Sequence, residues 1–356
     1  MEKIWENKQD ESEKDPSGKE PSSGRAPSPV PTGKVLFSPS QTQSESFRTP
    51  RPFAVSGTTA SSSSRKAFFS KGSLFQDRVI TAVFHSSGTE RGTFLSAPQE
   101  NSFLPENPDL GVIKLYPLPE KEEEYAALME KLSAESRAQK EGESVTPEIL
   151  SFGIQEKKFC WSMTKYKELT SLESFIQAKS PMNEHKALFT IYAIASLLDR
   201  AYPRWGFHGR LKPSKILFGL KKPPLLLGAG LTPFLRKNAK EMLEGETFFY
   251  ASPEYLSGGE LSWRSDIYSL GIIFFRLLAG VLPFYSGDPE EVKRAHLETP
   301  LPPVSEKNPS VRISTPTLGI LNRMTMKDPE KRFFARTKLL EALIQADDAL
   351  PQEEKE

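Results

Sequence analysis

The spacing of apolar residues changes abruptly near residue 169, and this change most constrains the fold. Before it, short apolar runs such as RVITAVF, GVIKLY and KFCWSM are separated by turn-forming residues, which is typical of strands. A stretch rich in Ala, Glu and Leu, residues 120–139, lies among these runs and favours a helix. After the change, runs such as HKALFTIYAIASLLDRAY follow the helical period. The sequence therefore predicts an α+β chain with a small sheet-rich lobe and a mainly helical lobe.

We expect the sheet-rich lobe over residues 73–168 and the helical lobe over residues 169–349. Residues 1–72 consist mainly of Ser, Pro, Thr, Gly and charged residues. A segment of this kind buries too little apolar surface to offset the entropy lost on ordering. The sequence therefore predicts a disordered N-terminal tail over residues 1–72, and a short polar tail over residues 350–356.

Charge and cysteine content argue against several classes of protein. The net charge is +1, which provides no overall field to attract nucleic acid or anionic lipid. The one cysteine, Cys160, cannot form an internal disulfide. The chain opens without an apolar leader, and its most apolar run, residues 270–284, is short for a membrane span. We expect a soluble cytoplasmic protein, with signal-less secretion as the other location, that binds neither nucleic acid nor membrane.

Four short blocks follow one another in the helical lobe. They are HGRLKPSKIL (208–217), LLLGAGL (225–231), YASPEY (250–255) and SDIYSLG (265–271), and KDPEKRF (327–333) follows them. The ordered set resembles protein kinases, in which a catalytic loop, a metal-binding loop, an Ala-Pro-Glu segment and a buried helix occur in this order. Lys212 and the proline after it match the serine/threonine-kinase form of the loop. The resemblance implies a bilobal protein-kinase-like fold with a β-rich N-lobe and an α-helical C-lobe.

The resemblance assigns structural roles to four residues. His208 would hold the catalytic loop, and Asp266 would accept hydrogen bonds from the backbone of that loop. Glu254 and Arg332 would form the buried ion pair that ties the Ala-Pro-Glu segment to the lower lobe. Retention of these positions implies that the scaffold is kept.

A tentative nucleotide site follows from the same resemblance. Lys114, in the middle of the run GVIKLY, stands where kinases keep the lysine that holds the α- and β-phosphates. Its partner would be a glutamate of the next helix, either Glu124 or Glu130, and the sequence does not decide between them. Lys212 would line the same site.

The residues that perform phosphoryl transfer are missing. Arg210 stands where the catalytic Asp is expected, and a guanidinium does not accept a proton. Lys215 stands where an Asn holds metal, and an ammonium cannot ligate Mg²⁺. Gly228 replaces the metal-binding Asp of the Asp-Phe-Gly motif, and the HSSGTERGTF turn lacks the glycine spacing of a phosphate cover. We therefore expect no metal site and no intact set of catalytic residues.

The leading hypothesis is a catalytically impaired kinase-fold protein, a pseudokinase, that acts as a scaffold or regulator. Its partner would be another protein, such as a kinase or a signalling protein, and its oligomeric state is left open. We expect no cofactor, with metal-free ATP as the alternative. Two other functions are kept: an atypical ATP-binding serine/threonine protein kinase or other nucleotide-using enzyme, and a phosphate- or anion-binding module built on the basic residues around Arg210 and Lys215.

Overall fold

A computed structural model describes the chain from Phe69 to Pro351, apart from several short gaps. These gaps are residues 88–90, 100–108, 118–121, 143, 156–157, 168, 220–221 and 229–244. The predicted N-terminal and C-terminal tails therefore lie largely outside the described residues. Phe69, which the prediction left in the N-terminal segment, is 6% exposed and packs edge-on against Phe75 and Phe94. The packed part of the chain thus includes residues before 73.

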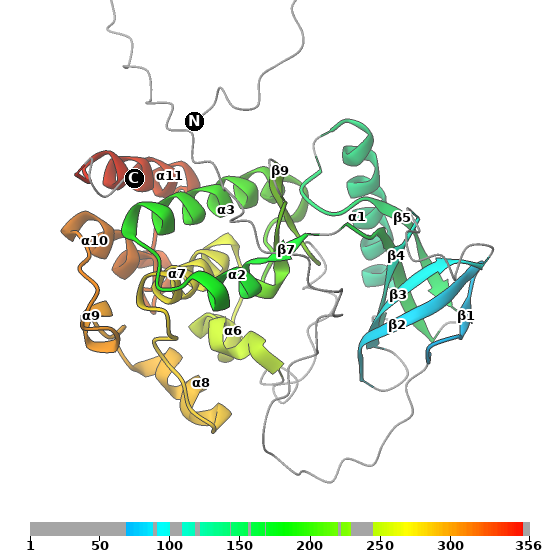
Figure 1. Ribbon diagram of the computed structural model, residues 1–356, viewed down its shortest axis with the longest axis horizontal. Coiled ribbons are helices and arrows are strands. Elements are labelled where there is room, and N and C mark those ends of the chain that lie inside the picture. The colour runs from blue at the N-terminus through cyan, green and yellow to red at the C-terminus, as the bar shows by residue number, and fades with distance from the viewer. Residues whose placement is uncertain are drawn as a thin grey trace, which may run out of the picture. The chain divides into compact units, whose positions relative to one another are not determined.

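The N-lobe is built on one antiparallel sheet of six strands in the order β1-β2-β3-β4-β6-β5 (Figure 1). The strands are β1 (Leu74–Phe75), β2 (Arg78–Ser87), β3 (Arg91–Pro98), β4 (Gly111–Pro117), β5 (Ile149–Gln155) and β6 (Phe159–Lys165). Five of these six correspond to runs that the sequence marks as strands. The sequence indicated them as short apolar runs separated by turn-forming residues.

Strand β4 separates two apolar clusters, since successive side chains point to opposite faces of a sheet. Ile113 and Leu115 face a cluster of aromatic and aliphatic residues on one side. Tyr116 belongs to the cluster on the other side, against helix α1 (Glu122–Lys140). Lys114 has the same parity as Tyr116, and its Nζ lies 5.1 Å from the centre of that ring. The alternation therefore presents Lys114 on the helix side of the sheet.

Helix α1 covers the sheet through Leu128 and Leu132, which are spaced one helical turn apart. Cys160 of β6 is buried in the same cluster. Burial raises the pKa of the Cys160 thiol to about 11, so the reactive thiolate is disfavoured. The cysteine is packed as an apolar side chain.

The C-lobe is mainly helical and includes a small sheet of three strands. Its helices are α2 (Leu172–Lys179), α3 (Glu184–Trp205), α6 (Pro253–Leu256), α7 (Trp263–Ala279), α8 (Pro289–Glu298), α9 (Val304–Lys307), α10 (Thr315–Met324) and α11 (Arg336–Asp348). The small sheet has the order β7-β8-β9 and consists of β7 (Thr170–Ser171), β8 (Ile216–Gly219) and β9 (Lys222–Leu226). The described residues of this lobe also form the 3-10 turns η3 (Pro213–Lys215), η4 (Gly245–Tyr250) and η5 (Pro329–Lys331).

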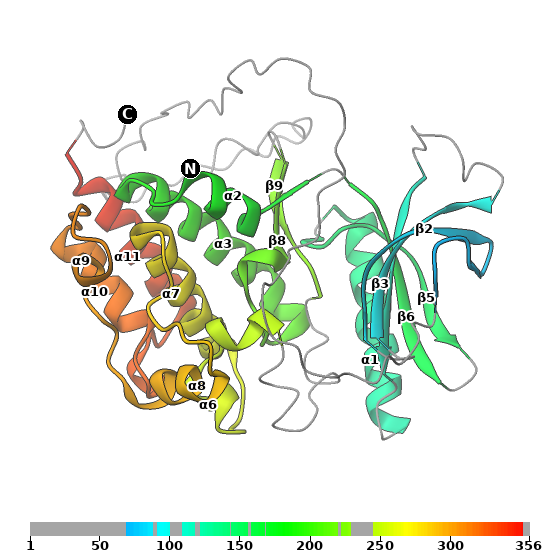
Figure 2. The same ribbon diagram turned by 60° about the horizontal axis from the view of Figure 1, so that its bottom comes forward.

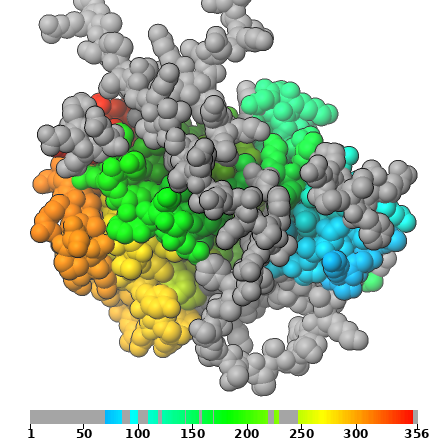
Figure 3. All heavy atoms as spheres, viewed as in Figure 1, coloured from blue at the N-terminus to red at the C-terminus, as the bar shows by residue number. Residues whose placement is uncertain are grey.

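Helix α7 is the centre of the C-lobe, because nearly every side chain from Ser265 to Ala279 is buried. A capping box between Ser262 and Ser265 starts it, and Gly280 in the left-handed region ends it. Figure 2 shows α3, α10 and α11 packed around this helix, with the six-stranded sheet and α1 at the other end of the molecule. In Figure 3 the blue strands and the orange helices occupy opposite ends of the visible face.

The predicted α+β bilobal fold is confirmed. Each long helical run of the sequence forms a helix, and the change of period near residue 169 coincides with the passage from β6 to the small sheet and α2. In the described part of the chain, no helix combines the length and hydropathy that a membrane crossing requires.

Substitutions at two helical glycines, Gly271 of α7 and Gly319 of α10, test how closely these helices pack. A Cβ at Gly271 would lie 2.7 Å from Thr325 Cγ2 and 3.0 Å from Met324 Cβ. We expect Gly271→Ala to lower the free energy of unfolding by about 1–3 kcal/mol, because overpacking outweighs the better helix propensity of Ala. Urea denaturation measures the change.

The matched control is Gly319 of α10, around which no atom of the described residues lies within 4 Å of an added Cβ. Gly319→Ala should raise the free energy of unfolding by about 0.5–1 kcal/mol through helix propensity alone. Equal effects of the two substitutions would contradict this account of the α7–α10 contact.

Candidate functional site

The candidate site begins at Asp266, near the start of α7. Its Oδ2 accepts a hydrogen bond from the backbone N–H of His208 at 2.6 Å, and its Oδ1 accepts one from Gly209 at 2.7 Å. Burial raises the pKa of the Asp266 carboxyl to about 7, and the two backbone donors oppose that rise. Asp266 thus lies where the resemblance implies, and it fixes the backbone of residues 208–209 to the core helix.

His208 connects two of the sequence blocks. Its Nδ1 accepts a hydrogen bond from the N–H of Arg210 at 3.2 Å, and its Nε2 lies 3.2 Å from the carbonyl oxygen of Leu227. A neutral ring with its proton on Nε2 satisfies both contacts. Burial, with the charge of Lys215 adding to it, lowers the pKa of His208 to about 3. The loop at 208–210 is therefore joined to the residue next to Gly228.

Lys114, Lys215 and Gly228 come together from three different elements. Lys114 is on β4 of the N-lobe, Lys215 ends η3, and Gly228 follows β9. A Cβ atom at position 228 would lie 3.4 Å from Lys215 Nζ and 3.6 Å from Lys114 Nζ. Gly228 has a φ of +76°, which glycine adopts readily. The resemblance assigns Lys114 to a nucleotide site and Lys215 and Gly228 to replaced metal-ligand positions, and the structure brings the three residues close together.

The charges at this point are mostly of one sign. The ammonium of Lys114 lowers the pKa of Lys215 well below its ordinary value, and burial and the charges of Lys212 and Arg210 act in the same direction. Burial also lowers the pKa of Lys212, although Lys212 has a carboxylate partner, Glu246, at 3.5 Å. Lys215 is thus held in a site that disfavours its charged form.

The residues present do not fit a catalytic divalent cation. Mg²⁺ requires oxygen ligands, whereas Arg210, Lys215 and Gly228 offer none from their side chains. In the described ranges, no group of three or more His, Cys, Asp or Glu side chains is arranged to hold a metal. The turn that would cover the phosphates includes residues 88–90, which lie outside the described residues.

The two candidate glutamates of α1 occupy different faces of the helix. Glu124 lies one turn before Leu128 on the inward face, whereas Glu130 is exposed. Among the described residues, neither forms an ion pair with Lys114 within 4.0 Å. Glu124 therefore lies on the face of α1 that is turned toward the sheet, but it does not form the ion pair with Lys114 that the resemblance implies.

The buried carboxylate of α1 is instead Glu135, which the sequence analysis did not single out. It is 4% exposed and accepts hydrogen bonds from Ser144 Oγ at 2.7 Å and Trp205 Nε1 at 3.0 Å. It also contacts Thr146 and forms an ion pair with Arg204 at 3.3 Å. Its spacing of three from Leu132 on an apolar helix face was the signal that could have identified it. Glu135 ties α1 to the end of α3.

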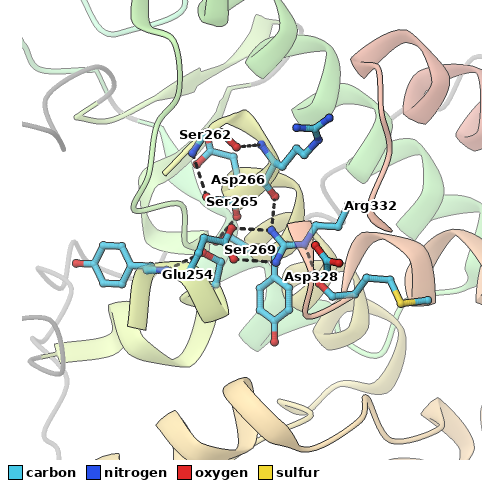
Figure 4. A network of polar contacts seen from close by, with 12 residues as sticks. Glu254, Ser262, Ser265, Asp266, Ser269, Asp328 and Arg332 are labelled. Atoms are coloured by element: carbon cyan, nitrogen blue, oxygen red, sulfur yellow. Dashed lines mark hydrogen bonds and ion pairs between the residues drawn. The ribbon is translucent and has the colours of Figure 1, made fainter. Parts of the chain in front are cut away.

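Glu254 and Arg332 form a bidentate ion pair at 2.7 and 2.8 Å beside the start of α7 (Figure 4). Arg332 is 1% exposed, and its remaining N–H groups donate to the carbonyl oxygens of Arg264, Met326 and Lys327. Burial alone would raise the pKa of Glu254, but the hydrogen bonds and charge of Arg332 outweigh it, so the pKa is lowered. The two residues lie in the arrangement that the resemblance implies.

A second ion pair, near the end of α7, was not foreseen from the sequence. Arg276 of α7 binds both carboxylate oxygens of Glu173 at 2.6 and 2.8 Å and donates to the hydroxyl of Tyr250 at 2.5 Å. Tyr250 is buried, and burial raises the pKa of its hydroxyl. The segment after residue 244 is therefore anchored to α2 and α7 through its tyrosine.

The buried ion pair gives a stability prediction. Glu254→Ala would leave the guanidinium of Arg332 buried with two of its five hydrogen bonds unmet. We expect the free energy of unfolding to fall by about 3–5 kcal/mol, which chemical denaturation measures. The control is Glu330→Ala, because Glu330 is 72% exposed in its ion pair with Arg264 and should change stability by less than about 1 kcal/mol. A small effect of Glu254→Ala would mean that Arg332 is not held as described.

The like-charged lysines give a pH prediction. Lys215 has a lowered pKa in the folded chain, so the unfolded chain binds more protons below about pH 10.4 and stability rises as pH increases toward that value. Lys215→Met removes this penalty. We expect the variant to be more stable than the wild type by at least about 1 kcal/mol at pH 7, with the gap narrowing toward pH 10.

Denaturation at several pH values measures this gap. Among the described residues, the charged groups that act on Lys215 are Lys114 of β4, Lys212 just before η3 and Arg210 of the loop, and the neutral ring of His208 lies beside them. Lys338→Met, at an exposed lysine paired with Glu341, is the control and should change stability by less than about 0.5 kcal/mol. A less stable Lys215→Met variant, or a gap that does not depend on pH, would overturn the prediction.

Comparison with known proteins finds serine/threonine-protein kinases among the relatives of this chain. The chain is 29% identical over 183 residues to the serine/threonine-protein kinase PrkC of Bacillus subtilis, and the match covers 50% of this chain and 28% of that protein. It is 27% identical over 194 residues to the serine/threonine-protein kinase pkn3 of Myxococcus xanthus, covering 52% and 36%. It is 36% identical over 100 residues to the serine/threonine-protein kinase ULK4 of Mus musculus, covering 28% and 8%.

The chain thus spans about a third or less of the length of these relatives. Residues 111–343 match the family described as protein kinase domain, which is well over half of the chain. This range includes Lys114, the loop from His208, Gly228 and the Glu254–Arg332 pair. The chain belongs to the protein kinase family.

Proposed function

We propose that this chain is a catalytically impaired member of the protein kinase family that acts as a scaffold or regulator of another protein. The observation that carries the proposal is the meeting of Lys114 Nζ and Lys215 Nζ at Gly228. In an active kinase, oxygen ligands for metal and an Asp base occupy this neighbourhood. Here a lysine, a glycine and Arg210 stand at those positions.

Electrostatics supports the loss of the metal. At an effective dielectric near 20, a unit charge about 4 Å from a divalent ion gives several kcal/mol of repulsion. Phosphoryl transfer depends mainly on positioning and on neutralising the charge of the phosphates through Mg²⁺. A site that repels the metal therefore loses most of its catalytic power.

The retained scaffold supports a role that depends on shape. The contacts of Asp266 with the loop, and of Glu254 with Arg332, hold the backbone independently of any nucleotide. A protein surface supported in this way can recognise a partner without chemistry at the site. We propose another kinase or a signalling protein as that partner.

A phosphate-transfer assay tests the proposal. The full chain is incubated with radiolabelled ATP, Mg²⁺ or Mn²⁺ and a general protein substrate. We expect wild type to transfer no more label than the Lys114→Met variant, which serves as the control for contaminating kinases. Metal-dependent transfer that disappears in Lys114→Met would refute the proposal.

That opposite outcome would support the second candidate, an atypical ATP-binding serine/threonine protein kinase. The placement of Lys114 on β4, facing the end of β9, is the observation that favours this candidate. A triple variant, Arg210→Asp with Lys215→Asn and Gly228→Asp, restores the residues that active kinases have at these positions. It distinguishes an impaired kinase from an atypical active one. Metal-dependent ATP hydrolysis in this variant but not in wild type would support impairment by these three residues.

A further inference from the structure

Helices α10 and α11 lie side by side at the end of the C-lobe away from the six-stranded sheet (Figure 1). Between them is a groove of about 410 Å³, which we call the α10–α11 groove. Its lining includes Gly319, Ile320 and Arg323 of α10, Ala342 and Ala346 of α11, and Phe333. Residues three or four apart share one face of a helix. The groove is therefore bounded by one face of each helix.

The floor of the groove is apolar and its rim is low. Ile320 is 7% exposed, Phe333 3% and Ala346 1%, so these side chains are packed into the lobe. Gly319 is exposed, and apart from its own helix backbone no described atom lies within 4 Å of a Cβ placed there. The distance at which a helix packs depends on the side chains at the contact. The hydrogen of Gly319 and the methyl group of Ala342 therefore allow a further helix to approach closely.

The groove carries positive charge at one residue. Among the described residues that line it, Arg323 is the one with a charged side chain. Its guanidinium lies 4.7 Å from the centre of the Phe333 ring, a cation–π contact that engages its flat face.

The N–H donors of Arg323 have no carboxylate from the described part of the chain. Arg264, Arg276 and Arg336 of the same lobe each bind one. A guanidinium presents five donors in a fork that fits a carboxylate in a bidentate pair. The groove thus combines an apolar floor with a cation suited to an acidic partner.

We propose that the α10–α11 groove docks an amphipathic helix of a partner protein, with an aspartate or glutamate of that helix bound to Arg323. An amphipathic helix fills such a groove through apolar residues at i, i+3, i+4 and i+7. Charge complementarity with Arg323 selects an acidic helix over a basic one. The inference rests on the proposed function, a scaffold or regulator of another protein, and it deepens that function by assigning the surface and the kind of partner.

Selection of displayed peptides tests the groove. The full chain is presented to a randomised library of helix-forming peptides of about 15 residues, or about four turns of helix. Peptides that bind wild type are then measured against Gly319→Trp, whose indole would occupy the groove. We expect the selected peptides to carry the apolar spacing and an acidic residue, and to bind Gly319→Trp about tenfold or more weakly.

The matched control is Gly287→Trp, which places the same side chain at another exposed glycine, before α8, with no described atom within 4 Å of an added Cβ. It should bind the peptides as wild type does. A urea midpoint of Gly319→Trp at or above that of wild type shows that its loss of binding is not unfolding.

Reversal of charge tests the ion pair without filling the groove. Arg323→Glu should weaken binding of the acidic peptides by about tenfold or more. Changing the acidic residue of the peptide to lysine should restore binding to Arg323→Glu, because the pair is then complementary again. An Arg323→Glu variant that binds like wild type, or the absence of this rescue, would contradict the assignment of Arg323.

The remaining outcomes identify other occupants. A selection that yields no peptide dependent on position 319, or that yields basic helices, overturns the inference. A wild-type dimer that Gly319→Trp dissociates in sedimentation equilibrium also overturns it, because the occupant would be a second copy of this chain. A failed selection with a negative transfer assay removes this surface and leaves catalytic impairment standing. Groove-dependent peptides together with metal-dependent transfer would refute impairment and leave the groove.

Discussion

The C-lobe depends on a buried guanidinium whose donors are all satisfied. Arg332 makes five hydrogen bonds, two to Glu254 and three to backbone carbonyls, and these equal the donor inventory of the side chain. The cation also lies 5.0 Å from the centre of the Tyr268 ring. A charge buried this deeply is tolerated only when its partners are in place, so it fixes η5, α6 and the start of α7 relative to one another. The loop held by Asp266 is positioned from that same start of α7.

The loss of acidic residues at the site has a physical pattern. Of the three departures, Arg210 and Lys215 bring positive charge and Gly228 brings space beside the two lysines. The result is a site in which the side chains at these three positions offer no oxygen ligand to a metal ion. The scaffold around it does not depend on that change, because Asp266 and Glu254 act on the backbone and on Arg332 and do not contact the replaced side chains. This separation explains how the fold accommodates Arg210, Lys215 and Gly228.

The fold could be predicted because its signals are local. The short apolar runs of the N-lobe indicated strands, and the runs with helical period indicated α3 and α7. The ordered blocks drew attention to Asp266, Glu254 and Arg332. The contact of Lys114 with Lys215 could not be foreseen from spacing, since it depends on how closely a strand of one lobe approaches a turn of the other. The role of Glu135 was hidden for the same reason: α1 is rich in glutamate, and only the approach of Trp205 and Arg204 distinguishes this one.

The contacts of Glu135 also bear on motion between the lobes. Glu135 of α1 has four partners, two in the segment at 144–146 and two at the end of α3, so it joins a helix of the N-lobe to a helix of the C-lobe. Each hydrogen bond to such a charged group contributes about 1.5–3 kcal/mol, so swinging α1 outward would break several at once. In the proposed scaffold role, a body held in this way would lose little conformational entropy on binding a partner.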